Sequence, residues 1–152
     1  MKKMTKLFQV AELQVQYLPT QVVGSKITIP EDAVLILKDF YDYKTIFLQE
    51  QFIVVYLNRA LRPIGVYKAT TGGINSSIID VRLVMSVALN VAASSIILSH
   101  NHPSGELTPS NTDLQITKKV KKAADLLDIQ LTDHIILNGK YDFYSMSSNG
   151  DF

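Results

Sequence analysis

One segment, residues 99–113, constrains this chain more than any other. It reads Ser-His-Asn-His-Pro-Ser-Gly-Glu-Leu-Thr-Pro-Ser-Asn-Thr-Asp. Residues two apart on an extended chain point to the same side, so His100 and His102 can face a common point. Pro103 favours extended backbone at the residue before it, which continues this alternation through His102. The segment therefore predicts two imidazoles directed to one place, at the end of a buried strand expected over 94–99.

A carboxylate can join them from the start of the next helix. Ser110 is a favourable helix N-cap, and Asp113 occupies the capping-box position in the first turn. The chain has no cysteine, so metal ligands have to be histidines and carboxylates. Two imidazoles and one carboxylate leave an open position on zinc, as in catalytic sites. Capping alone explains Ser110 and Asp113, and His-x-His alone is weak, but the two together favour a metal.

The rest of the chain predicts strands and helices around this segment. Strands are expected over 7–18, 45–57, 63–69, 94–99, 131–137 and 141–146, helices over 30–40, 80–93 and 110–128, and loops over 70–77 and 100–109. Hairpins and crossovers both occur in this order, which favours an α/β or α+β sandwich with one mixed sheet flanked by helices. We expect a single domain over 30–152, with residues 1–29 as an N-terminal extension that contains a strand.

The composition of the chain limits which kinds of partner we expect it to bind. The net charge of +1 predicts no broad basic surface for duplex DNA. One local cluster of lysines is best interpreted as a solvated helix face: Lys118, Lys119, Lys121 and Lys122. No apolar run approaches the ~20 residues of a membrane span, and the N-terminus makes a poor signal peptide. We therefore expect a cytoplasmic protein with no membrane partner. The oligomeric state is left open.

The motif residues resemble the JAMM (JAB/MPN-type) metalloprotease signature. More narrowly, His-Asn-His-Pro-Ser-Gly at 100–105 and Pro-Ser-x-x-Asp at 109–113 are similar to the hallmark of the bacterial RadC-like family. Further similarity lies in Gly-Gly-Ile-Asn at 72–75 and in Asp-His-Ile-Ile at 133–136. The resemblance covers roughly residues 30–146 and implies a JAB/MPN fold of the cytidine-deaminase-like kind.

The resemblance also implies roles for individual residues. The matching ligands of one zinc ion are His100, His102 and Asp113, and the matching Ser110 helps to stabilise an oxyanion. An upstream glutamate activates the zinc-bound water in such enzymes, and Glu50 is the position that fits. The implied activity is hydrolysis of peptide or isopeptide bonds in a peptide or protein substrate.

The residues themselves give some support to Glu50. A strand without a bulge would place it on an apolar face with Ile46, Leu48, Phe52 and Val54. A carboxylate there is costly unless a metal-bound water or a cation compensates it. A bulge that turns Glu50 to solvent is the alternative. Glu106 in the motif loop is the rival carboxylate, although loop exposure explains it.

Three other polar residues have expected supporting roles. His134 is interpreted as a structural or second-layer histidine rather than a direct ligand, because three ligands already exist. Ser99 and Asn101 are expected to orient the motif loop.

Two other functions stay open. One is a DNA-associated role in repair or recombination, and the other is a non-catalytic interaction module. Longer RadC proteins carry an N-terminal segment resembling a helix-hairpin-helix, and residues 1–44 contain no glycine-centred hairpin of that type. Such a segment would favour DNA binding. A non-catalytic module typically lacks one of the ligands, and none is lacking here.

Overall fold

The computed structural model describes residues 24–71 and 79–152. Eight elements follow one another along this part of the chain: α1 (Pro30–Leu37), β1 (Gln51–Leu57), β2 (Pro63–Thr71), α2 (Val81–Asn90), β3 (Ser95–Asn101), α3 (Asn111–Leu126), β4 (Gln130–Leu137) and β5 (Phe143–Ser145). The strand expected over 7–18 and most of the loop expected over 70–77 lie outside the described residues. None of the described helices is long and apolar enough to cross a bilayer.

The five strands form one mixed sheet in the order β2-β1-β3-β4-β5. β3 and β4 are parallel, because α3 connects them as a crossover, and the other neighbouring pairs are antiparallel. β3 is therefore the central strand, with β1 on one side and β4 on the other. This arrangement confirms the predicted mixed sheet flanked by helices.

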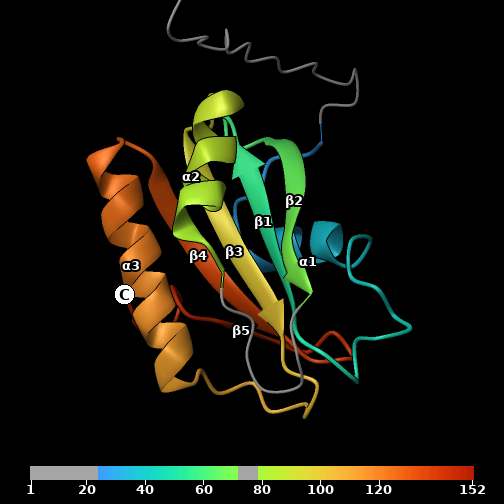
Figure 1. Cartoon of the computed structure of the whole chain (residues 1–152). Coiled ribbons are helices and arrows are strands. Elements are labelled where there is room, and N and C mark those ends of the chain that lie inside the picture. The colour runs from blue at the N-terminus through green and yellow to red at the C-terminus, as the bar shows by residue number, and fades with distance from the viewer. Residues whose placement is uncertain (1–23, 72–78) are drawn as a thin grey trace, which may run out of the picture.

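The helices cover both faces of the sheet (Figure 1). α2 and α3 pack on one face over Val54, Tyr56 and Leu98, while α1 packs on the other over Val55 and Ile97. Alternate residues of the same strands thus enter two different cores, as the period of a strand requires.

The helix starts follow the expected local signals. Pro30 begins α1, and the Asp80 side chain accepts a hydrogen bond from the backbone N–H of Arg82 at the start of α2.

The lysine cluster lies on α3, where Lys118, Lys119 and Lys122 are exposed. Lys121 pairs with Asp125 at 3.3 Å. The interpretation of this cluster as a solvated helix face is confirmed.

Several element boundaries differ from prediction by a few residues, and two of the differences affect candidate site residues. The strand expected from Thr45 begins only at Gln51, because residues 43–48 form turns. The Asp42 carboxylate accepts from the N–H of Lys44 at 3.0 Å, and the Thr45 carbonyl accepts from the N–H of Leu48 at 2.8 Å. These local hydrogen bonds compete with strand pairing. β3 extends through Asn101, so His100 belongs to the strand and not to the loop expected over 100–109.

Candidate metal centre

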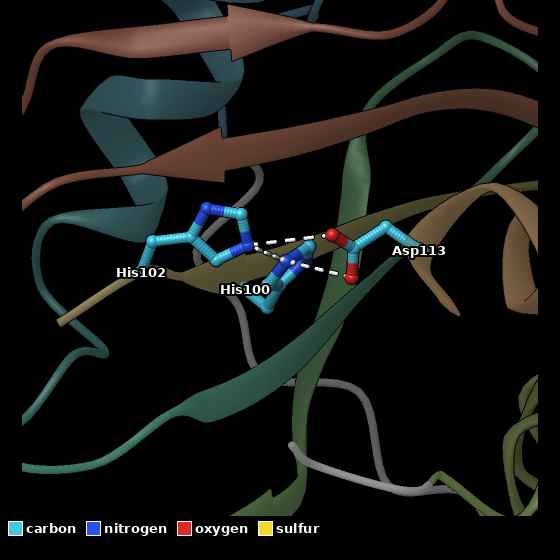
Figure 2. A group of neighbouring side chains, drawn as sticks. All are labelled: His100, His102 and Asp113. Atoms are coloured by element: carbon cyan, nitrogen blue, oxygen red, sulfur yellow. Dashed lines mark hydrogen bonds and ion pairs between the residues drawn. The ribbon is translucent and has the colours of Figure 1, made fainter. Parts of the chain in front are cut away.

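The end of β3, the residue that follows it and the first turn of α3 bring His100, His102 and Asp113 together (Figure 2). His100 lies in β3, opposite Phe52 of β1 and Ile136 of β4. His102 follows the strand directly, and its N–H donates to the Leu137 carbonyl at 2.9 Å, so the chain stays beside β4 past the end of β3. Asp113 lies in the first turn of α3.

The three side chains converge at distances that suit one ion. His100 Nε2 lies 2.9 Å from His102 Nε2 and 3.1 Å from Asp113 Oδ1. His102 Nε2 lies 3.4 Å from Asp113 Oδ2. Two atoms bound ~2.05 Å from a tetrahedral zinc lie about 3.3 Å apart. Small shifts would therefore place all three atoms around a common cation.

The hydrogen bonds around His102 leave a lone pair directed inward. Its Nδ1 lies 2.7 Å from the Glu106 carbonyl oxygen, which can only accept, so Nδ1 carries the proton. In the neutral ring, Nε2 is then free to bind a cation. Burial disfavours the protonated form of His102, but the nearby Asp113 carboxylate and the Glu106 carbonyl favour that form more strongly and raise its pKa.

The Asp113 carboxylate is held as an anion. Burial alone would raise its pKa, but the neighbouring imidazoles of His100 and His102 favour the charged carboxylate more strongly and hold that pKa well below its usual range. The lone pair of His102 Nε2 and the anionic carboxylate of Asp113 therefore face the same point, with His100 Nε2 beside them, and a divalent cation fits this set of donors.

Ser110 caps α3 and orients Asp113. Its N–H and its hydroxyl both donate to Asp113 Oδ2 at 2.7 Å, and its Oγ accepts from the Asp113 N–H at 3.1 Å. The capping interpretation is confirmed and does not exclude the ligand interpretation, because Oδ1 still faces His100. The same N-cap that starts the helix thus fixes the carboxylate of the centre.

Glu50 lies beside the centre. It was predicted to lie on the apolar face of a strand, but it precedes the first residue of β1. Ile46 is buried in the core on the α1 side, and Leu48 is 66% exposed. Glu50, His102 and Ser110 line one open hollow of about 580 Å³. The Glu50 carboxylate also contributes, after the hydrogen bonds, to the raised pKa of His102.

The fully buried Asn101 holds the Glu50 segment in place. Its Oδ1 accepts from the Gln51 N–H at 2.7 Å, and its Nδ2 donates to the carbonyls of Ile46 and Gln49 at 2.8 and 3.1 Å. Asn101 was expected to orient the motif loop, and instead it orients the segment that carries Glu50. Nothing in the local pattern identifies this contact, because the partners are about fifty residues apart.

The side chains of Ser99 and Glu106, two other residues considered in the sequence analysis, make their hydrogen bonds away from the three converging side chains. Ser99 points to the α1 side, where its hydroxyl lies 2.6 Å from the Tyr41 hydroxyl, so it does not orient the motif loop. The carboxylate of Glu106 accepts from the Leu107 and Thr108 N–H groups and from the Thr108 hydroxyl. The Thr108 hydrogen bonds lower the pKa of Glu106, and this carboxylate braces its own loop.

His134 lies behind His100, away from the open hollow. It is fully buried, and its Nε2 lies 2.8 Å from His100 Nδ1. Burial and the neighbouring His100 ring hold its pKa well below the usual value. Its interpretation as a second-layer histidine agrees with this position. Sequence reasoning missed Thr117, which contacts His134 and lies one helical turn after Asp113.

Fold and centre together define a class of protein: an α+β domain whose His-x-His pair and helix-borne aspartate can hold a metal beside an open hollow. The family model described as RadC-like JAB domain matches residues 27–151. The chain therefore belongs to the RadC-like JAB domain family, as its motif predicted.

Several curated relatives carry the name UPF0758 protein. The one from Flavobacterium johnsoniae is 41% identical over 127 residues, which cover 84% of this chain and 54% of that protein. Another, from Porphyromonas gingivalis, is 41% identical over 102 residues, which cover 67% of this chain and 45% of the relative. A third, from Caldanaerobacter subterraneus, is 38% identical over 136 residues, covering 83% and 57%. The chain thus spans about half the length of these relatives.

Proposed function

We propose that this chain is a zinc-dependent hydrolase of peptide or isopeptide bonds. The observation that carries the proposal is the convergence of His100, His102 and Asp113 next to an open hollow, which is lined by His102 and by a second carboxylate, Glu50. Three protein ligands leave room for a water or a substrate oxygen, which is the pattern of catalytic zinc sites.

His100, His102 and Asp113 would hold the ion. Zinc, when bound, supplies a Lewis acid that acidifies water and polarises a carbonyl group. A two-histidine, one-carboxylate site also accepts iron, manganese or nickel, so zinc is the proposed metal on chemical preference.

Glu50 is the proposed general base. Its place in the hollow beside His102 lets it take a proton from the attacking water and pass it to the leaving amine. Water thereby adds across the carbon–nitrogen bond, and the products are one carboxylate and one amine. Ser110 lines the same hollow, but its hydroxyl proton is directed to Asp113 Oδ2. To donate to an oxyanion, as the family resemblance implies, that hydroxyl has to rotate away from Asp113.

The walls of the hollow suit a polypeptide. Phe47 and Leu48 are 60% and 66% exposed there and lie beside Pro103. A second hollow of about 290 Å³ shares Phe47 and Pro103 and extends to Lys140. An extended segment can therefore bury an apolar side chain on Phe47 while its backbone passes the metal centre.

The alternative functions have less support among the described residues. A non-catalytic interaction module does not need a complete ligand set beside a candidate base, and this chain has both. A DNA-associated role would need a basic surface, whereas the net charge is +1.

Metal analysis combined with cleavage assays tests the proposal. We expect about one zinc per chain and cleavage of some members of a panel of peptides and isopeptide-linked conjugates. Glu50→Gln should retain the metal and lose ~100- to 10,000-fold in kcat. Glu31→Gln on α1 is the matched control and should retain both. Absence of bound metal would refute the proposed zinc site. Full activity of Glu50→Gln would refute Glu50 as the general base.

A further inference from the structure

A buried chain of hydrogen bonds leads from α3 to the back of His100. Thr117 Oγ lies 2.6 Å from the Asp113 carbonyl oxygen and 2.5 Å from His134 Nδ1. His134 Nε2 in turn lies 2.8 Å from His100 Nδ1. Thr117 and His134 have no exposed surface, so water cannot replace either partner.

The donor and the acceptor in each of these hydrogen bonds follow from the chemistry of the groups. A carbonyl oxygen cannot donate, so the single hydroxyl proton of Thr117 goes to Asp113. The Met146 sulfur is a weaker acceptor and lies farther away, at 3.7 Å. Thr117 Oγ has to accept from His134, whose Nδ1 therefore carries the proton.

The same reasoning extends to His100. His134 is fully buried and its ring nitrogens contact His100 and the Thr117 hydroxyl, not a carboxylate, so the surroundings favour a neutral imidazole. With its proton on Nδ1, this ring presents a lone pair at Nε2, which accepts from Nδ1–H of His100. A neutral His100 whose proton is on Nδ1 has a lone pair on Nε2, the atom that faces His102 and Asp113. Phe52 stacks parallel to the His100 ring at 5.7 Å between centroids and also contacts His134, so neither ring turns over easily.

We propose that Thr117 and His134 are positioning residues that fix His100 in the tautomer required of a metal ligand, before any metal arrives. This inference rests on the proposed metal-binding function and adds the origin of the proton arrangement. The helix that supplies the ligand Asp113 thus also sets the protonation of the ligand His100, through the carbonyl of Asp113 itself.

The first test needs no variant and no metal. The chain contains three histidines, all in this centre, so long-range proton–nitrogen correlation spectra of the ¹⁵N-labelled, metal-free protein show only three imidazoles. We expect His134 and His100 each to carry the proton on Nδ1. A proton on Nε2 of His100 as the main form would overturn the proposal.

The second test removes the Thr117 hydroxyl, the first group in this series of hydrogen bonds. Thr117→Val keeps the shape of the side chain but lacks the hydroxyl, so Nδ1–H of His134 loses its acceptor. We expect the proton to move to His134 Nε2, the Nε2–H form of His100 to appear, and zinc affinity to fall ~10- to 100-fold. Thr117→Ser should restore both.

A matched control separates this effect from packing. Thr132 in β4 has a buried hydroxyl without a hydrogen-bond partner in the described part of the chain, and it lines a different hollow next to α1. Thr132→Val should leave the three imidazole tautomers and the zinc affinity unchanged. Unchanged tautomers and affinity in a folded Thr117→Val would contradict the proposal. If the wild-type protein bound no zinc, the proposed function would fail, while the metal-free spectra would still decide the tautomer question.

Discussion

The two halves of the candidate metal centre are built from different kinds of structure. The buried half, consisting of His100, His134 and Thr117, comes from two strands and a helix and has almost no exposed surface. The open half, consisting of Glu50, His102 and Ser110, comes from loops and the end of a helix and lines the hollow. The comparison indicates two different roles. In our proposal, the buried half fixes the position of the lone pair on His100, and the open half leaves room for a substrate.

The largest expected difference between the halves concerns stability. His100→Ala and His102→Ala should both abolish tight metal binding, because each removes a ligand. In the metal-free protein, His100→Ala should lower the free energy of unfolding by about 2 to 4 kcal/mol, since it leaves a cavity and an unpaired His134 nitrogen. His102→Ala should cost about 1 kcal/mol or less.

Urea unfolding in the presence of a chelator measures this difference, and zinc titration of the same samples measures binding. Equal losses of stability in the two variants would mean that the two halves do not differ as described. Tight metal binding by either variant would contradict the ligand assignment.

A smaller effect is expected where the two halves meet, at Asn101. Asn101→Ala removes the hydrogen bonds to Ile46, Gln49 and Gln51. We expect a loss of about 2 to 3 kcal/mol in unfolding free energy and a fall in kcat with the metal retained, because the segment carrying Glu50 is released.

Asn58→Ala is a suitable comparison, since Asn58 accepts two backbone hydrogen bonds in the turn between β1 and β2. It should reduce stability without a specific loss of kcat. If Asn101→Ala kept the wild-type kcat, the placement of Glu50 would not depend on this amide.

The smallest effect is expected at the outer edge of the open half. Phe47→Ala should raise KM ~3- to 10-fold for peptides with an apolar side chain near the cleaved bond, with kcat almost unchanged. Gly139→Ala should act in the same direction, because a Cβ at Gly139 would overlap the Phe47 ring and displace it. Steady-state kinetics on matched apolar and polar peptides checks both, and equal effects on the two peptides would argue against an apolar subsite.

Much of the fold, and the convergence of the three candidate ligands, was predictable because it follows local rules. Alternation along a strand places His100 and His102 on one side, and the N-cap geometry of Ser110 places Asp113 in the first helical turn. These rules act over a few residues, so the printed sequence is sufficient to apply them. The same locality explains the error at residues 45–50, where apolar alternation suggested a strand but hydrogen bonds around Asp42 and Thr45 form turns.

The sequence by itself determined which residues can be ligands, what starts the helix that carries one of them, and to which family the motif belongs. Only the tertiary structure decided that Asn101 holds the Glu50 segment and that Thr117 and His134 stand behind His100. The physical reason is that a hydrogen bond between distant parts of the chain depends on strand order and helix packing, which bring together groups that no local pattern relates.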